Sequence, residues 1–309
     1  MKKLIYILLI IVLFGSCEKY IDIEIPDEGR KITVNCFINN SDKPILMLTR
    51  SKFILDNGYE FTMIDSAKAY LYQDGVQVAE FFQQDSSNIS NPIEIGSYKA
   101  NYTCQPGKQY TIKVIKNGET ITSSTQIPNS VTIQSIDTMT ILNQDGYKNL
   151  RVKITINDPA NIENYYQFSF RTISFGYEQI LSFPVNQSDF GLTGTTYQSY
   201  LITNDKLFNG QSKTYIFDLD AGNFYDIVTP LSVVVNGVSK DMFLYYQQLQ
   251  KYQNAQNSFL AEPVMMYTNI ENGLGIFAGY SSHITNIDVP RLTDDIIIEG
   301  KNSTYDHKK

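Results

Sequence analysis

The feature that most restricts the fold of this chain is a series of short segments in which apolar and polar residues alternate. Lys31 to Ile38 and Ala67 to Gln73 are two clear examples. Asp74-Gly75 and Asn117-Gly118 separate segments of this kind, and such two-residue turns are the strongest local signature of a β-hairpin. Because turn signals recur about every 8–12 residues without a helical period, they predict a β-sandwich.

The strand signals fall into two groups, which predicts an all-β chain with two antiparallel β-sandwich domains. The first group begins near Arg30 and ends at Pro128, so we expect the first domain at residues 30–128. Residues 129–290 are also rich in strand-like segments and are expected to form a second β-rich domain. The polar stretch 291–309 is expected to be a loose tail.

One segment, residues 239–256, departs from the strand pattern. It contains neither Gly nor Pro, and its apolar residues follow helical spacing: Met242, Tyr245, Tyr246, Leu249 and Tyr252. Ser239 is a natural N-cap, and Asp241 lies in the expected first turn, where a negative charge favours the helix dipole. We therefore expect one amphipathic helix on the second domain, with its tyrosine stripe packed against the core.

The start of the chain has the pattern of a lipoprotein signal peptide. Two lysines precede an apolar run from Leu4 to Phe14, which is shorter than the roughly 20 residues that span a membrane. Gly15-Ser16 then precede Cys17, as a lipoprotein signal peptidase requires. We expect removal of residues 1–16, lipid on Cys17 and an acidic tether at residues 17–29. The alternative is an ordinary secretory signal followed by an unrelated cysteine.

The charge and the aromatic content restrict the partners. Loss of the leader removes two lysines and no acid, which changes the formal net charge from −7 to −9. An acidic chain without basic clusters argues against binding of nucleic acid and against adsorption on anionic lipid. The 22 Tyr and 17 Phe suit half-buried strands and recognition surfaces, whereas the absence of Trp argues against a sugar-stacking platform without excluding one.

Two further cysteines, Cys36 and Cys104, share strand parity with apolar neighbours, so both thiols are expected to point toward a core. In an oxidising compartment they could form one disulfide, which would stabilise the fold by about 4 kcal/mol in the chain-entropy model. Two separate buried thiols are the alternative, and their spacing does not decide between the two.

Catalytic and metal sites find little support in the sequence. The two histidines, His283 and His307, are too few for an ordinary zinc site, and no nucleophile elbow surrounds a serine. A glycoside hydrolase would need paired carboxylates, for which the best candidates are Asp218, Asp220 and Glu262. Asp226 could join Asp218 and Asp220 in binding calcium, but the spacing of a known calcium loop is missing.

Two tripeptides match a short acceptor pattern for bacterial O-glycosylation, Asp65-Ser66-Ala67 and Asp137-Thr138-Met139. Ser66 and Thr138 would carry the sugar. A pattern this short is expected about once by chance in such a chain. It is consistent with an exported protein.

Several motifs together resemble the Bacteroidota lipoproteins classed as domain of unknown function 4249. The matching segments are EKYIDIEIP after Cys17, YLYQDG, PGKQYTIKV, TINDPANIENYYQFSF and YYQQLQKYQNAQNSFLAEPVMMYTNIENGLGIFAGY. The resemblance implies an outer-membrane lipoprotein whose first domain is immunoglobulin-like. It also implies companionship with a TonB-dependent transporter, and it supplies neither catalytic residues nor a cofactor. The acidic residues after Cys17 suit export to the cell surface: Glu18, Asp22, Glu24, Asp27 and Glu28.

The sequence therefore predicts a non-enzymatic binding or accessory lipoprotein that is held at the outer membrane by its lipid. A structural or adhesive envelope protein is the first alternative. A glycan hydrolase with an unrecognised acidic site is the second.

Overall fold

The computed structural model describes residues 29–53, 56, 61–84, 96–143, 145–146, 148–174, 177–186, 195–220, 229–256 and 264–289. The expected leader, Cys17 with its expected lipid, most of the expected acidic tether and the tail at 291–309 lie outside these ranges. Three candidate site residues also lie outside them: Asp226, Glu262 and His307.

The first part of the chain forms seven strands and confirms both predicted hairpins. The strands are β1 (Ile32–Asn39), β2 (Ile45–Arg50), β3 (Lys68–Gln73), β4 (Val76–Gln83), β5 (Tyr98–Ala100), β6 (Gln109–Lys116) and β7 (Glu119–Gln126). The turn residues Asp74 and Gly75 have φ of 49° and 83°, and Asn117 and Gly118 have 51° and 85°. Positive φ at both positions is the type I′ turn that matches the twist of a hairpin.

The rest of the described chain adds ten strands and one helix. These are β8 (Thr132–Leu142), β9 (Lys148–Asn157), β10 (Tyr165–Ser174), β11 (Tyr177–Ile180), β12 (Phe183–Asn186), β13 (Thr195–Gln198), β14 (Leu201–Asn204), β15 (Ser212–Asp220), β16 (Thr229–Val238), α2 (Lys240–Gln256) and β17 (Leu274–Val289). The predicted fold class is confirmed: the chain is all-β and sandwich-like with a single described helix.

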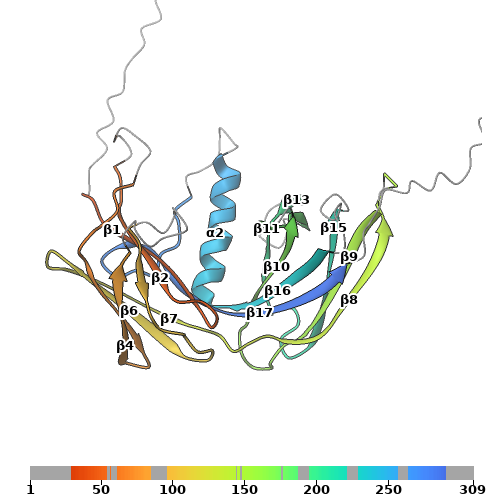
Figure 1. Ribbon diagram of the computed structural model, residues 1–309, viewed down its shortest axis with the longest axis horizontal. Coiled ribbons are helices and arrows are strands. Elements are labelled where there is room, and N and C mark those ends of the chain that lie inside the picture. The colour runs from red at the N-terminus through yellow and green to blue at the C-terminus, as the bar shows by residue number, and fades with distance from the viewer. Residues whose placement is uncertain are drawn as a thin grey trace, which may run out of the picture.

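Most strands belong to one 12-stranded sheet in the order β11-β10-β16-β17-β1-β2-β5-β4-β3-β6-β7, with β14 also paired to β10. A three-stranded sheet, β15-β9-β8, faces part of it, and β12 and β13 form a separate pair. In Figure 1 the large sheet is a curved layer, and α2 stands on its concave side between the two groups of strands.

Strand β17 connects the two halves of the molecule. Its first half, Leu274–Tyr280, pairs in parallel with β1. Its second half, Tyr280–Val289, pairs in antiparallel fashion with β16. The parallel pairing is an exception in a sheet that is otherwise antiparallel, and it is possible because the whole second half of the chain separates β1 from β17.

Strand β17 contributes to the cores on both sides of the division expected at residue 129. Two cores are present, one on each half of the large sheet. Phe277 and the preceding Ile270 are buried in the core of the first half, whereas Ile276 and Ala278 are buried in the core of the second. Ile270 and Phe277 therefore belong to the first core, although the sequence pattern places residues 129–290 together in the second domain.

The predicted helix is present and begins where its capping residue indicates. The backbone N–H of Met242 donates to Oγ of Ser239 at 3.2 Å, so Ser239 is the N-cap. Met242 and Phe243 are buried, and Tyr245 and Tyr246 pack against the second core. The expected stripe is exposed at its far end, where Tyr252 is 40 % accessible.

Candidate functional site

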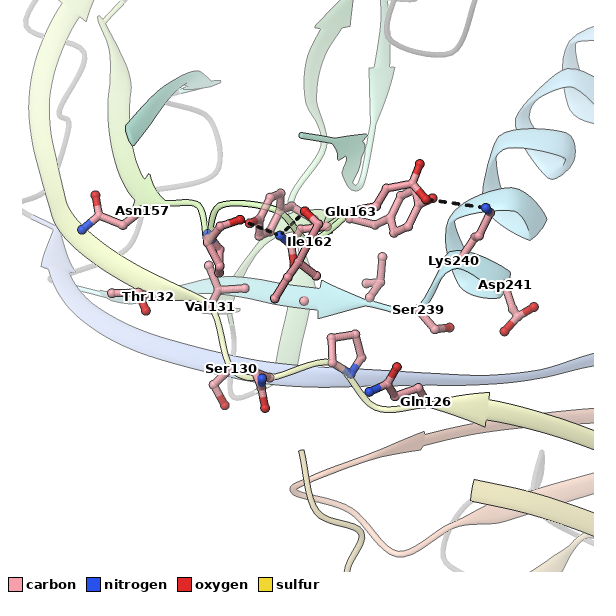
Figure 2. Close-up of a pocket in the computed structure, with 18 residues that line it drawn as sticks. Gln126, Ser130, Val131, Thr132, Asn157, Ile162, Glu163, Ser239, Lys240 and Asp241 are labelled. Carbon is pink, nitrogen blue, oxygen red and sulfur yellow. Dashed lines mark hydrogen bonds and ion pairs between the residues drawn. The ribbon is translucent and has the colours of Figure 1, made fainter. Parts of the chain in front are cut away.

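A pocket of about 450 Å³ lies at the joint between the two halves (Figure 2). The linker 126–132, the loop before β10 and the first turn of α2 line it. Its charged groups are already paired: Lys240 Nζ lies 3.5 Å from Glu163 Oε2, and Asp241 accepts hydrogen bonds from Thr125 and Tyr267 at 3.2 and 2.7 Å. This internal pairing indicates a structural joint between the halves.

Two buried carboxylates support the loops behind this pocket. Asp158 is 7 % and Asp205 is 1 % exposed. Asp158 accepts from Tyr166 Oη and from the Gly210 N–H, and Asp205 accepts from the Asn164 N–H at 2.7 Å. Every partner belongs to the loops around residues 158–166 and 205–211, so this network fixes the end of the second sandwich.

Two further pockets, of about 480 and 620 Å³, adjoin each other, and α2 lines the first of them. They share Phe37, Ser41, Asp42 and Tyr280, and together we call them the α2 groove. Side chains of β1, β10, β16, β17 and α2 line it. The groove thus crosses the line along which β17 joins the two halves.

The floor of the α2 groove carries neutral hydrogen-bonding groups from adjacent strands. Gln167, Asn236 and Ser282 lie opposite one another in the registers of β10, β16 and β17. Asn236 Nδ2 donates to Gln167 Oε1 at 2.9 Å. Asn236 is only 6 % exposed, and its Oδ1 has no hydrogen-bond partner among the described residues. A buried polar atom without a partner is unfavourable and needs an explanation.

Aromatic side chains form one wall of the groove. The ring centroid of Tyr246 lies 5.0 Å from that of Tyr200 and 6.2 Å from that of Phe37. Burial raises the pKa of the Tyr200 phenol, and the neighbouring Tyr246 and Tyr245 raise it further. The pKa of the Tyr246 phenol is also raised, chiefly by burial. The phenols of Tyr200 and Tyr246 are therefore neutral near pH 7.

The turn between β1 and β2 forms the other wall and is tied to the floor. Asn39 Oδ1 accepts from the N–H groups of Ser41 and Asp42, both at 2.7 Å. Asn39 Nδ2 donates to Tyr280 Oη at 2.8 Å, and the Ser282 N–H donates to Asn40 Oδ1 at 2.8 Å. These bonds hold the wall in place, so the groove is preformed.

Charged residues line both pockets of the groove. Asp42 lines both, Arg171 lines one, and Lys43 and Lys99 line the other. Burial raises the pKa of Tyr280, the hydrogen bond from Asn39 lowers it, and Asp42 and Arg171 act in opposite directions. The groove thus combines neutral polar and aromatic groups with charges of both signs.

The carboxylates proposed from sequence for hydrolysis lie elsewhere. Asp218 makes a bidentate ion pair with Arg151 at 2.7 and 2.8 Å, on the three-stranded sheet. Asp220 Oδ1 accepts from Asn149 Nδ2 at 3.3 Å. Neither residue lines the pockets described above.

The remaining sequence candidates occupy separate places. Ser281 Oγ donates to the Asn129 carbonyl at 3.0 Å, and His283 is exposed on β17. Ser66 and Thr138 are both exposed, as an acceptor of a sugar must be, and their modification stays a prediction. Among the described residues no group of three His, Cys, Asp or Glu side chains is placed to hold a metal ion.

Cys36 and Cys104 are both buried in the first core, in agreement with the predicted orientation. The structure has them as free thiols. Burial raises the pKa of the Cys104 thiol to about 12, although a hydrogen bond with Tyr110 acts in the opposite direction. Burial also raises the pKa of Cys36, with a further contribution from Cys104.

Comparison with known families identifies the chain. The model of the domain of unknown function DUF4249 matches residues 18–285. The protein belongs to the DUF4249 family. This confirms the resemblance seen in the sequence motifs, and the DUF4249 match covers both halves of the fold and the residues that line the α2 groove.

Other comparisons add little to the family assignment. No curated protein matches this DUF4249 chain. Among solved structures, collagen adhesin (CNA) from S. aureus is similar with a TM-score of 0.19 and 6 % identity, over 83 % of this chain and 94 % of that chain. A TM-score this low carries no argument about shared architecture or function. Among the described residues no helix combines the length and apolar character needed to span a membrane.

Sequence reasoning did not identify the α2 groove. The alternation in YYQFSFR places Gln167, Ser169 and Arg171 on the face of β10 opposite the core residues Phe168 and Phe170. That pattern predicts a polar outer face. It gives no signal that β17, β1 and α2 enclose this face.

Proposed function

We propose that this DUF4249 protein is a non-enzymatic envelope lipoprotein, anchored through Cys17, that binds a ligand in the α2 groove. The observation that carries the proposal is the groove itself. It is concave, large enough for a small ligand, and lined by aromatic rings around a few polar groups, which is the usual composition of a binding site. Its walls are held by hydrogen bonds within the protein.

The shared strand supports a binding role that needs little motion. Because β17 is hydrogen-bonded to β1 at one end and to β16 at the other, the two halves share a continuous sheet. Phe37 of β1 and Tyr246 of α2 are therefore fixed relative to each other in the aromatic wall of the groove. A preorganised site loses less conformational entropy when a ligand binds.

The pairing of the candidate carboxylates favours binding over hydrolysis. A general acid in a glycosidase needs a raised pKa and a position in a cleft with a second carboxylate. Asp218 instead forms a bidentate ion pair with the guanidinium of Arg151 on the three-stranded sheet. Its side chain lies outside the α2 groove.

We further propose that the lipid holds the protein at the outer membrane, with the cell surface favoured over the periplasmic face, beside a TonB-dependent transporter. The motif resemblance and the acidic residues after Cys17 support this arrangement. In such a partnership the groove would hold the cargo, or part of it, near the transporter. The lipid would keep the local concentration of the protein high.

Affinity isolation from gently solubilised outer membranes tests this function. The full-length protein is tagged after Lys309, and the proteins that accompany it are identified by mass spectrometry. We expect a stoichiometric TonB-dependent transporter with the wild type and its loss with Cys17→Ser, which lacks the lipid attachment site. Recovery of the protein with other abundant lipoproteins only would contradict the partnership.

A further inference from the structure

We infer that the α2 groove binds a neutral oligosaccharide, in which the ring faces pack on the aromatic wall and the hydroxyls bond to the amide floor. This inference rests on the proposed binding function and assigns its ligand class. It is carried by three features of the groove: the chemistry of the floor, the aromatic wall and the position of the floor strands inside the sheet.

The floor suits a ligand that carries many hydroxyl groups. Gln167, Asn236 and Ser282 each combine donor and acceptor capacity in one side chain, as paired hydroxyls of a sugar require. Asn236 lines the groove, and its buried Oδ1 lacks a donor. This oxygen is shielded from solvent, so ligand hydroxyls meet the accessible parts of the other floor side chains that line the groove, Gln167 and Ser282.

The wall supplies apolar area of matching shape. Phe37, Tyr200, Tyr246 and Tyr280 line the groove. An aromatic ring presents a flat apolar surface, and tyrosine adds a hydroxyl at its edge. The C–H face of a pyranose ring can therefore pack on the wall while its hydroxyls reach the floor. The chain lacks Trp, so tyrosine and phenylalanine would carry this contact.

The position of the floor argues against an extended peptide. Peptides commonly bind a sheet by adding a strand to an open edge. The floor strands β10, β16, β17 and β1 are interior members of the 12-stranded sheet, and their backbone groups bond to neighbouring strands. Recognition in the groove must therefore come from side chains. The charged side chains of the groove have both signs: Asp42 lines both pockets, Arg171 lines one, and Lys43 and Lys99 line the other. The floor itself carries amide and hydroxyl groups, which suit an uncharged ligand.

Three tryptophan variants test the inference, because the chain has no Trp of its own. Ser199→Trp places a reporter on the exposed rim of the groove. Ser169→Trp fills the floor. Thr140→Trp, on the exposed strand β8 away from the groove, is the matched control. Circular dichroism and the unfolding temperature of each full-length protein establish that it is folded.

The ligands are maltotriose, cellotriose and mannotriose, with trialanine and trigalacturonic acid for comparison. We expect at least one neutral trisaccharide to change the Trp emission of Ser199→Trp but not of Thr140→Trp. In calorimetry, Ser169→Trp should bind that sugar roughly tenfold or more weakly than the wild type. Binding of only trialanine or trigalacturonic acid, or binding of no trisaccharide by the wild type, would overturn the inference. The transporter partnership is tested separately by co-isolation and does not depend on this result.

Discussion

Phe37 in β1 and Tyr246 in α2 lie with their ring centroids 6.2 Å apart and their planes inclined by 44°. One belongs to the first strand of the chain and the other to the helix between β16 and β17. Their contact shows that α2 packs across the joint and is not an attachment of the second half alone. The groove beside it therefore depends on how the two halves are fixed together.

The close approach of β17 to β1 should depend on a glycine. Gly275 has φ of +102°, and a Cβ there would lie 2.0 Å from the carbonyl oxygen of Val34. Gly275→Ala is therefore expected to destabilise the protein by about 3 kcal/mol or more, through backbone strain and a clash with backbone. Gly146→Ala is the matched control, because Gly146 also has positive φ (+84°) but nothing within 4 Å. Urea unfolding compares the two, and equal losses would contradict the close pairing of β17 with β1.

The N-cap of α2 should contribute measurably to stability. Ser239 Oγ accepts from the N–H of Met242 at 3.2 Å and from that of Gly279 at 3.3 Å, and Ser239 is 6 % exposed. Ser239→Ala is expected to lower the free energy of unfolding by about 1–2 kcal/mol, because two buried N–H groups lose their acceptor. Ser239→Asp should recover part of this loss, since aspartate is also a favourable N-cap. A change of less than about 0.3 kcal/mol in Ser239→Ala would show that the cap is unimportant.

The buried thiols should react slowly in the folded protein. The pKa of Cys104 is raised to about 12 and that of Cys36 is raised as well, so both are protonated at pH 8 and thiolate is scarce. Iodoacetamide at pH 8 is expected to leave both unmodified in the native state. When the protein is unfolded without reductant, iodoacetamide should modify both Cys36 and Cys104, in addition to any reaction at Cys17. Unfolded chains that take up none until a reductant is added would instead establish a disulfide between Cys36 and Cys104.

The raised thiol pKa values also give a pH dependence of stability. A thiol whose pKa is higher in the folded than in the unfolded protein stabilises the folded state. This contribution is fully present at pH values below the pKa in the unfolded protein, which is about 8.5 for cysteine. That contribution decreases as the pH rises toward 12. We therefore expect the unfolding temperature to fall between about pH 9 and pH 11, and to fall less in the Cys36→Ala, Cys104→Ala double variant. If the unfolding temperature falls equally with pH in the wild type and in the double variant, the thiols are not the cause of the pH dependence.

Neutralising Asp218 should not affect ligand binding. The carboxylate pairs with Arg151 on the three-stranded sheet and lies outside the groove. Asp218→Asn and Glu262→Gln are expected to bind the same ligand with unchanged affinity and to show no turnover of glycans, like the wild type. Glycan cleavage by the wild type that Asp218→Asn abolishes would support the hydrolase alternative.

Local signals in the sequence predicted the local structure well. The Asp74-Gly75 and Asn117-Gly118 turns, the Ser239 cap and the inward direction of Cys36 all depend on residues close in the chain. The pairing of β17 with β1 could not be predicted in this way, because Leu274–Tyr280 carries no local mark of its distant partner. The α2 groove was missed for the same reason, since its floor requires the registers of β10, β16 and β17 together.

Native mass spectrometry of the protein released gently from its own outer membrane tests the central claim most directly, because anchor and ligand are read from one spectrum. The account predicts a lipidated chain that begins at Cys17 and carries a non-covalent ligand. It also predicts that Ser169→Trp loses the ligand mass and that Thr140→Trp keeps it. A chain without lipid, or a ligand mass that is absent from the wild type or unchanged in Ser169→Trp, would contradict the account.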